Sequence, residues 1–270
     1  MTATSVSAGA RGWTADLRGQ RALVTGSTRG IGAAIAEGLA RSGAAVVLHG
    51  RDAAGVAAAA EALRARLEGE DLVADVRGAA FDIADPEATL AGALCVLTEL
   101  GGIDVLVNNA GVQWRSPLLE LRDTDWDRVL ATNLTSCFLL AREAARGMVD
   151  RGRGKIINIC SVQSSLVRPT TAPYAAAKAG LASLTRTMCA EWAACGVQVN
   201  ALAPGYVGTD LNADLVADES FHTWVIGRTP ARRWCTPEDV VGPALWLASG
   251  ASDFVNGQVI YVDGGITAVV

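Results

Sequence analysis

Short apolar runs alternate with longer stretches of helical periodicity from Arg21 to the end of the chain. The runs predict strands at 22–25, 45–49, 76–81, 105–108, 155–160, 197–203 and 258–262. The stretches between them predict helices at 30–42, 52–67, 86–100, 126–151, 174–195 and 236–249. Several runs are apolar throughout, which is typical of strands that are covered on both faces. The helix at 174–195 has one apolar face, because large apolar residues recur there at helical spacing: Leu181, Leu184, Met188 and Trp192.

This alternation predicts an α/β fold in which one doubly wound parallel sheet of Rossmann type, with about seven strands, has helices on both faces. At 270 residues, half of them apolar, the chain is long enough to bury a sizeable core. The sequence has no internal repeat, charge block or linker that would divide it. We therefore expect an N-terminal extension at 1–19 and a single domain at 20–270. The segment 204–233 is the least regular, and we expect it to be a lid at the carboxyl ends of the strands, where such sheets bind ligands.

A glycine-rich stretch, Thr25-Gly-Ser-Thr-Arg-Gly-Ile-Gly32, connects the first strand to the first helix. Glycine permits a tight turn and a close approach to the backbone, and the helix N-terminus offers free N–H groups to a pyrophosphate. A turn of this kind between a strand and a helix predicts a dinucleotide site. The residues of the turn expected to bind the cofactor are Gly26, Ser27, Thr28, Arg29, Gly30, Ile31 and Gly32.

The end of the second strand bears on the choice between NADP and NAD. It reads His49-Gly50-Arg51 and has no carboxylate to receive the ribose of NAD, whereas Arg29 and Arg51 would favour the 2′-phosphate of NADP. We expect NADP; NAD is the alternative, in which Arg51 is only solvated and Asp52 only caps the next helix. Further cofactor contacts are expected after the third, fourth and sixth strands, at Asp82, Ile83, Asn109, Ala110, Gly111, Pro204, Gly205, Val207 and Thr209. Three of these residues belong to the Asn-Asn-Ala-Gly turn at 108–111. This turn can also be an ordinary loop without a cofactor contact, because Asn and Gly are common in turns.

Tyr174 and Lys178 are four residues apart, which places both on one face of a helix and within reach of one site. The spacing alone is common in helices whose polar residues only face solvent. The position of the pair is more informative than its spacing. Tyr174 follows Ser161 by 13 residues, at the sheet edge where the nucleotide-binding turn is also expected.

Four motifs in this order resemble the short-chain dehydrogenase/reductase family over about residues 20–265. They are Thr-Gly-x3-Gly-x-Gly at 25–32, Asn-Asn-Ala-Gly at 108–111, Ser161 followed by Tyr174-x3-Lys178, and Pro204-Gly205. The resemblance implies an NAD(P)-dependent oxidoreductase in which Asn133 completes a catalytic tetrad with Ser161, Tyr174 and Lys178. It implies that Tyr174 and Lys178 also contact the cofactor. It further implies a homotetramer built through the helices at 126–151 and 174–195.

Three stretches, at 108–121, 172–206 and 252–267, are similar within this family to gluconate 5-dehydrogenases, and the first of them flanks the substrate side. The resemblance implies a sugar-acid substrate and a reaction that interconverts gluconate and 5-ketogluconate. A cation must then meet the substrate carboxylate, and we expect it among Gln113, Arg115 and Arg168, each of which is otherwise a solvated loop residue. Trp114 and Trp224 would wall the pocket or pack in the core.

A proton must move between the substrate alcohol and the protein in such a reaction. An unperturbed tyrosine has a pKa of about 10, so the charge of Lys178 would be needed to favour the phenolate of Tyr174 near neutrality. Ser161 would hydrogen-bond the same substrate oxygen. Lys178 would also hold the nicotinamide ribose, and Asn133 would support it through a water-linked proton path. The hydride belongs to the cofactor.

Composition narrows the partners to a small-molecule substrate. A net charge of −5 and a pI near 5.1 do not favour nucleic acid or an anionic membrane, and no apolar run is long enough to span one. Six cysteines without a Cys-x-x-Cys pair, and only His49 and His222 besides, do not predict a metal site. Cys160 is expected to be a buried structural thiol. The first 19 residues do not read as a signal peptide, so a cytoplasmic chain is expected.

Two other functions remain open on the sequence. The first is a 3-oxoacyl-carrier-protein reductase or another ketone reductase on the same scaffold, since the second and third stretches are also similar to such enzymes. The second, from another class, is a catalytically silent regulator that binds the cofactor. A silent protein would be free to lose at least one residue of the Asn133, Ser161, Tyr174 and Lys178 set, and all four are present.

Overall fold

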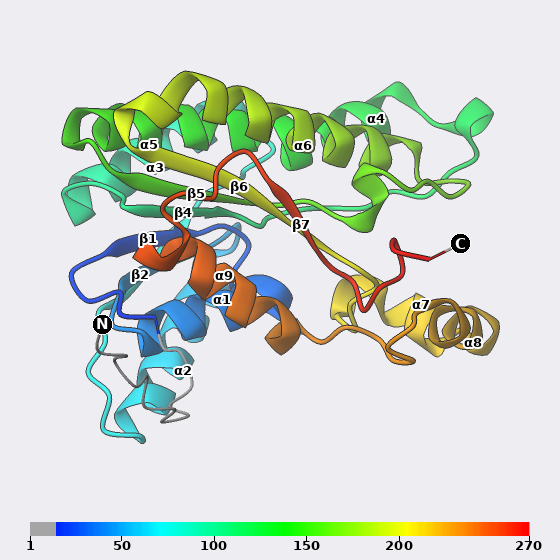
Figure 1. Cartoon of the computed structure of the whole chain (residues 1–270), viewed down its shortest axis with the longest axis horizontal. Helices are drawn as coiled ribbons and strands as arrows, with labels where there is room; N and C mark the ends of the chain where they lie inside the picture. The colour runs from blue at the N-terminus through cyan, green and yellow to red at the C-terminus, as the bar shows by residue number, and fades with distance from the viewer. Residues whose placement is uncertain (1–14, 270) are drawn as a thin grey trace, which may run out of the picture.

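The computed structural model describes residues 15–269 and contains one parallel sheet of seven strands (Figure 1). The strand order is β3-β2-β1-β4-β5-β6-β7, and every neighbouring pair runs parallel. The strands are β1 (Arg21–Val24), β2 (Ala45–Gly50), β3 (Val76–Ala80), β4 (Val105–Asn108), β5 (Gly154–Ile159), β6 (Val197–Pro204) and β7 (Val259–Val262). The predicted fold class is confirmed, and each predicted strand is present.

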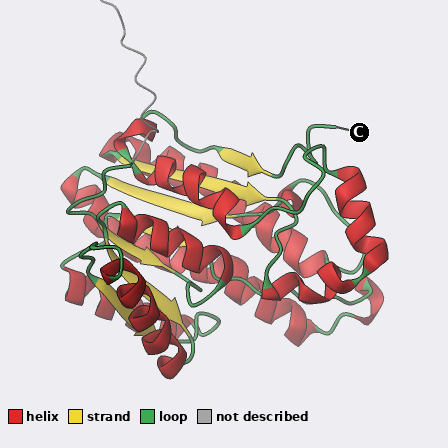
Figure 2. Cartoon of the chain, turned by 90° about the horizontal axis from the view of Figure 1, so that it is seen from below, coloured by secondary structure: helices red, strands yellow, loops and turns green. Residues whose placement is uncertain are grey.

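Helices cover both faces of this sheet. On one face lie α1 (Gly30–Arg41), α2 (Ala53–Glu68) and α9 (Pro237–Ala248). On the other lie α3 (Pro86–Leu100), α5 (Ser136–Arg151) and α6 (Ala172–Trp192), as Figure 1 shows. Figure 2 shows the arrows of the strands pointing to one side of the molecule. That side holds the loops after the strands, and with them α4 (Asp123–Leu130), α7 (Ala213–Ala217) and α8 (Glu219–Arg228).

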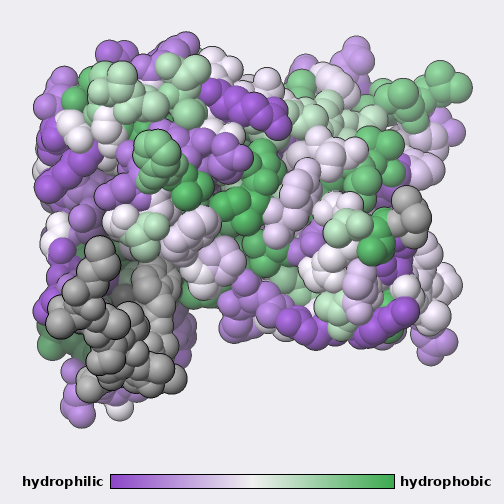
Figure 3. Space-filling view, viewed as in Figure 1, coloured by the Kyte–Doolittle hydropathy of each residue, from purple (hydrophilic) through white to green (hydrophobic). Residues whose placement is uncertain are grey.

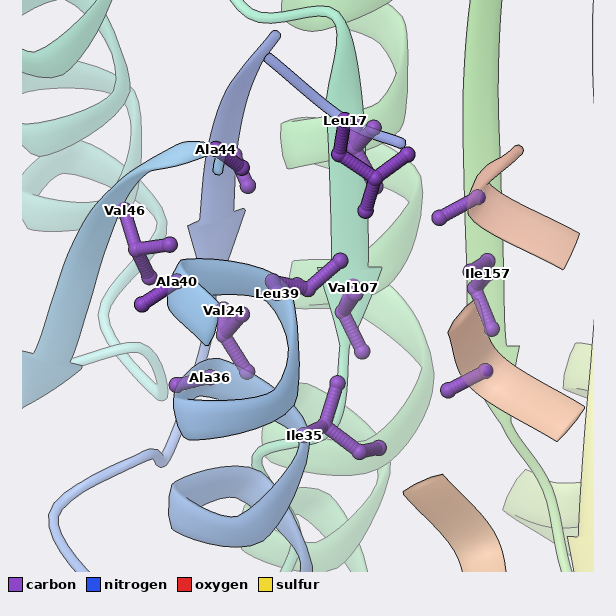
Figure 4. Close-up of a cluster of buried hydrophobic side chains, with 14 of the residues drawn as sticks. Leu17, Val24, Ile35, Ala36, Leu39, Ala40, Ala44, Val46, Val107 and Ile157 are labelled. Carbon is purple, nitrogen blue, oxygen red and sulfur yellow. The ribbon is translucent and has the colours of Figure 1, made fainter. Parts of the chain in front are cut away.

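A buried apolar cluster fixes α1 on the sheet. Figure 4 shows Ile35 and Leu39 of α1 beside Val24 of β1, Val46 of β2 and Val107 of β4. Burying one such side chain contributes about 1.5–3 kcal/mol. Because the glycine-rich turn runs directly into α1, this cluster also fixes the position of the turn.

The strand order places the switch point of the sheet at β1, which pairs with β2 on one side and with β4 on the other. After β1 the chain continues to α1 on one face of the sheet. After β4 it continues to the helices on the opposite face. A crevice forms outside the carboxyl ends of the strands at such a point, and doubly wound sheets bind dinucleotides there.

Two details differ from the sequence predictions. The helix expected at 126–151 is instead α4 and α5, separated by a π-helical turn at Ala131–Thr135. The pattern could not reveal this because a π turn adds one residue to a turn without changing the polar and apolar composition. The segment 204–233 contains α7 and α8 and is thus more regular than expected. The N-terminal extension proposed for 1–19 lies mostly outside the described residues.

Candidate active site

The first helix begins without a side-chain cap. Arg29 occupies the N-cap of α1 and no side chain accepts from the first N–H groups, whereas Asp52 caps α2 and Asp85 caps α3. Uncapped N–H groups and the positive end of the helix dipole favour an anion at this position. The structure therefore supports a phosphate-binding function for the glycine-rich turn.

Two glycines of the turn have a left-handed backbone conformation. Gly26 has φ +61° and Gly30 has φ +59°, a region that side chains rarely adopt. A Cβ on Gly26 would lie 2.8 Å from the Cα of Ala110, so the turns after β1 and β4 touch here. At Gly30 the nearest atoms belong to Thr209, 3.6 Å from the position of a Cβ. The turn is thus bounded by two of the segments that the sequence assigned to the cofactor.

Asn109 ties the two turns together. Its Nδ2 donates to the carbonyl oxygens of Thr25 (2.9 Å) and Gly26 (3.0 Å). The hydroxyl of Thr25 in turn accepts from the main-chain N–H groups of Asn109 (2.9 Å) and Ala110 (3.0 Å). The Asn-Asn-Ala-Gly motif is therefore part of the scaffold that shapes the glycine-rich turn. A direct contact of Asn109 with the cofactor stays a prediction.

His49 supports the same turn through a hydrogen bond that no sequence pattern predicted. The ring is 1% exposed and packs 4.1 Å, centroid to centroid, from Phe81. Its Nδ1 accepts from the N–H of Gly26 at 3.1 Å, so Nε2 carries the proton and donates to the carbonyl of Phe81 at 3.2 Å. Burial lowers the pKa of His49 to about 4, which keeps the ring neutral at physiological pH.

Two arginines flank the turn where a cofactor ribose would lie. Arg29 is exposed and is 3.6 Å from the carboxylate of Asp210. Arg51 is exposed directly after β2. The carboxylate of Asp52 accepts from the N–H of Gly55 at 2.8 Å, so it serves as a helix cap, as one interpretation of the sequence proposed. After β3, Asp82 accepts from the N–H of Ala84 (3.0 Å) and Ile83 is buried.

Ser161, Tyr174 and Lys178 lie together at the ends of β5 and α6. Ser161 is buried and caps the short turn that follows β5, with its Oγ accepting from the N–H of Gln163 at 3.1 Å. Lys178 is 3% exposed and donates from Nζ to the carbonyl of Ile159 at 2.6 Å. The same Nζ is 5.7 Å from the centre of the Tyr174 ring. The arrangement holds a buried ammonium beside a half-buried phenol.

Asn133 lies in the π-helical turn between α4 and α5 and is fully buried. Its Nδ2 donates to the carbonyl of Val112 (2.7 Å) and its Oδ1 accepts from the N–H of Val112 (2.8 Å). A Cβ on Gly111 would be 3.2 Å from Oδ1 of Asn133 and 3.8 Å from Nζ of Lys178. The side chain of Asn133 thus fixes the loop after β4 next to Lys178, and π turns often occur at functional sites.

The loops after β4 and β5, which carry Arg115 and Arg168, are joined to each other. The N–H of Ser116 donates to the carbonyl of Thr170 at 3.0 Å, which joins the two loops. Arg115 donates to Gln113 at 3.0 Å. Partial desolvation lowers the pKa of Arg115, and the positive charge of Arg168 lowers it further. Two adjacent guanidinium groups favour an anion between them.

Arg168 is the less satisfied of the two arginines. Its Nη1 is buried and has no hydrogen-bond partner among the described residues. Thr170, two residues later, has φ +69°, a strained conformation for a β-branched residue. Backbone strain and an unpaired buried donor are both costly, and both are frequent where a protein binds a ligand.

The segment after β6 carries an aromatic cluster, which we define as Tyr206, Phe221, Trp224 and Trp234. Trp224 therefore packs against other aromatic rings, although its side chain is half exposed. Trp114 is exposed as well and has the guanidinium of Arg122 5.8 Å from its ring centre. Val207 forms an isolated bridge with Cys235 and anchors the start of this segment beside Pro204 and Gly205.

Cys160 directly precedes Ser161 and is buried. Burial raises the pKa of Cys160 to about 11, so it is a structural thiol. No group of three or more His, Cys, Asp or Glu side chains that could hold a metal occurs within residues 15–269. None of the helices in that part of the chain is long and apolar enough to cross a membrane.

The parallel sheet and the uncapped turn at its switch point define a doubly wound α/β protein, in which Ser161, Tyr174 and Lys178 lie at the carboxyl ends of the strands. A family model described as Enoyl-(Acyl carrier protein) reductase matches residues 26–267. Gluconate 5-dehydrogenase of Gluconobacter oxydans is 50% identical over 251 residues, covering 93% of this chain and 96% of the relative. 5-Keto-D-gluconate 5-reductase of Escherichia coli K12 is 44% identical, covering 94% of this chain and 98% of the relative.

A solved structure of a gluconate 5-dehydrogenase is also similar to this chain over almost its whole length. The crystal structure of a gluconate 5-dehydrogenase from Burkholderia cenocepacia J2315 in complex with NADP and tartrate has a TM-score of 0.88 at 48% identity. The match covers 94% of this chain and 97% of that one. The chain belongs to the short-chain dehydrogenase/reductase family and is an NAD(P)-dependent oxidoreductase that acts on CH–OH groups. The predicted family and enzyme class are thereby confirmed.

Proposed function

We propose that this enzyme interconverts gluconate and 5-ketogluconate with NADP as the hydride carrier. The observation that carries the proposal is that the loops of Arg115 and Arg168 are joined by the bond from Ser116 to Thr170, and that the charge of Arg168 acts on Arg115. A small neutral ketone would leave both guanidinium groups without a counter-ion. A sugar acid supplies a carboxylate at one end and a secondary alcohol at the other.

The residues present fit NADP. The uncapped N–H groups at the start of α1 would hold the pyrophosphate, and Arg29 and Arg51 would hold the 2′-phosphate. The carboxylate of Asp52 is engaged as a helix cap through Oδ2. Relatives at 48% and 42% identity are described with NADP bound. The cofactor supplies the hydride acceptor or donor, and the protein supplies its position.

Tyr174 takes the proton from the substrate hydroxyl in the oxidative direction and returns it to the ketone in the other. The Nζ atom of Lys178 lies 5.7 Å from the centre of the Tyr174 ring, so Lys178 is next to the phenol that exchanges the proton. Ser161 donates to the same substrate oxygen while its negative charge develops. Asn133 keeps Gly111 and Val112 against Lys178, and so holds the wall of the site in place.

The carboxylate end of the substrate sets the specificity. Arg115 and Arg168 offer planar guanidinium groups, which bind a carboxylate in a bidentate manner. Gln113 accepts from Arg115 and orients it. A hydroxy diacid, tartrate, is the small molecule described in complex with the Burkholderia relative. The acceptance of sugar acids is the feature that separates this proposal from a carrier-protein reductase, whose substrate is a neutral thioester.

The test is the oxidation of NADPH by 5-ketogluconate, followed at 340 nm, with the unaltered enzyme and with Tyr174→Phe. We expect turnover that the substitution abolishes while NADPH binding persists. No turnover with any carbonyl compound would support the silent regulator. Full activity in Tyr174→Phe would remove Tyr174 from the acid–base role.

We also propose that the chain forms a homotetramer through α4–α5 and α6 and functions in the cytoplasm. Apolar side chains at the surface near α4 support a subunit contact: Leu118 and Leu119 are exposed there, and apolar atoms gather at that end of the molecule in Figure 3. Leu118 also lines a cavity of about 480 Å³ beside the start of α6, together with Arg168 and the small residues Ala172, Ala175, Ala176 and Ala179. The six free thiols fit a reducing compartment. Light scattering after gel filtration tests the assembly.

A further inference from the structure

One arginine of the substrate side is held by an aromatic ring from the lid segment. The guanidinium carbon of Arg168 is 4.6 Å from the ring centre of Phe221, which belongs to α8. A guanidinium group over an aromatic face is attracted by the ring quadrupole, and Arg stacks on rings better than Lys does. The contact therefore joins the loop after β5 to a helix that comes about 50 residues later in the chain.

The stacked guanidinium leaves a donor free. Nη1 of Arg168 is buried and has no partner among residues 15–269. A buried donor without a partner costs free energy, and a donor on a charged group costs more. An anion that accepts from Nη1 would remove this cost. The ring fixes one face of the guanidinium and leaves its edge, which carries the donors, for a ligand.

Phe221 itself is held on several sides. Trp224 stacks on it, with ring centres 5.4 Å apart and planes at 27°. Tyr206 meets it edge-on at 5.3 Å, and Trp234 lies 6.2 Å away. Such contacts restrict the orientation of a ring beyond simple burial. The position of Phe221, and with it that of Arg168, depends on α8 lying against Tyr206.

Charges around this pair come from two further elements. Arg115 of the loop after β4 adds a second positive charge, and Asp214 of α7 partly offsets it. The two guanidinium groups repel each other unless an anion lies between them. The protein thus keeps two like charges together and uses the lid to fix one of them.

We propose that Phe221 is a positioning residue that holds Arg168 in the orientation that receives the carboxylate of the substrate. Closure of α8 over the site is then coupled to the selection of acidic sugars over neutral ones. The inference rests on the proposed function for its choice of ligand. The inference goes beyond the proposed function because it assigns the selectivity for acidic sugars to a residue that does not touch the substrate.

The experiment compares binding of gluconate with binding of gluconamide, the uncharged amide of the same sugar acid, to the enzyme saturated with NADPH, which cannot accept a hydride from either ligand. Calorimetry or a competition assay gives both affinities. The variants are Phe221→Leu, which removes the ring, Phe221→Tyr, which keeps it, and Val225→Ala. Val225 is a buried residue of α8, so its truncation loosens the helix without removing the ring over Arg168.

We expect Phe221→Leu to weaken gluconate binding about tenfold and gluconamide binding less than twofold, in line with a partly desolvated cation–π contact. Phe221→Tyr should restore the gluconate affinity. Val225→Ala should weaken both ligands to the same degree. In turnover, Phe221→Leu should raise KM for gluconate with kcat little changed.

Equal losses for both ligands in Phe221→Leu, as in Val225→Ala, would show a structural role only and would overturn the inference. If Phe221→Leu changes the affinity for neither ligand, the inference is also wrong. Failure of the proposed function has a different signature, because gluconate would then bind to the unaltered enzyme without being oxidised. If the unaltered enzyme prefers gluconamide to gluconate, the carboxylate has no role and both proposals are wrong.

Discussion

His49 accepts a hydrogen bond from the main-chain N–H of Gly26 through its buried Nδ1 atom, at 3.1 Å. This bond connects the end of β2 to the first residue of the glycine-rich turn. The neutral ring is fixed as the Nε2–H tautomer by the carbonyl of Phe81. The shape of the cofactor turn therefore depends on a histidine that does not face the cofactor.

Replacing His49 by leucine should weaken NADP binding about five- to tenfold, because the N–H of Gly26 loses its acceptor and such a loss costs about 1 kcal/mol or more. His49→Asn places an oxygen near the position of Nδ1 and should retain most of the affinity. Fluorescence titration with NADPH measures both. Equal losses in the two variants would mean that packing against Phe81, and not the hydrogen bond, supports the turn.

The stability of the protein should decrease in acid partly through the same residue. Burial lowers the pKa of His49 from 6.5 to about 4, so between these values the unfolded chain binds a proton that the folded chain does not. The stabilisation is complete above pH 6.5 and is lost as the pH falls toward 4, with a total of about 3 kcal/mol. Urea unfolding at pH 7.5 and pH 4.5 should show a smaller loss in His49→Asn than in the unaltered protein. Parallel losses would contradict the assignment.

Arg51 should distinguish the two nicotinamide cofactors. Removal of its charge-assisted contact in Arg51→Ala should raise KM for NADPH about tenfold and leave KM for NADH unchanged. Arg64→Ala is a control, since it removes the same charge from a half-exposed position on α2 that pairs with Glu61. Steady-state kinetics with both cofactors provide the readout. A rise in KM that is the same for NADPH and NADH would exclude a 2′-phosphate contact.

Arg115 should contribute to binding of the acidic substrate and not to binding of neutral substrates. Arg115→Ala should raise KM for gluconate by about 10- to 100-fold, the range expected for a charge-assisted hydrogen bond, with KM for NADP unchanged. Arg122→Ala serves as the control, because Arg122 lies nearby but is paired with Asp125 at 2.6 Å. Activity toward a neutral ketone should be unaffected in both variants. If neutral ketones suffer equally from Arg115→Ala, the residue supports the loop and does not bind the substrate.

Much of this site could be predicted because its parts are local in sequence. The glycine-rich stretch at 25–32 and the Tyr174 and Lys178 spacing each encode geometry within one turn of chain. The alternation of strands and helices then predicts that such segments meet at one sheet edge. The structure places the predicted residues at that edge, and the roles assigned to them stay predictions.

Other features depend on contacts between distant segments, which no local pattern encodes. The bond between His49 and Gly26 joins neighbouring strands, and the stacking of Phe221 on Arg168 joins the lid to the loop after β5. The π-helical turn at Asn133 was missed because its sequence reads as an ordinary helix. Long-range packing decides these details, and it becomes visible only in three dimensions.

The central claim is that the site is built for a sugar acid, and one ratio tests it most directly. The measurement is kcat/KM for 5-ketogluconate divided by kcat/KM for an acetoacetyl thioester, both with NADPH at saturation. The two-arginine site predicts a preference for 5-ketogluconate of about tenfold or more, since a charge-assisted contact is worth at least that factor. A preference of tenfold or more for the thioester would contradict the account and would favour a carrier-protein reductase.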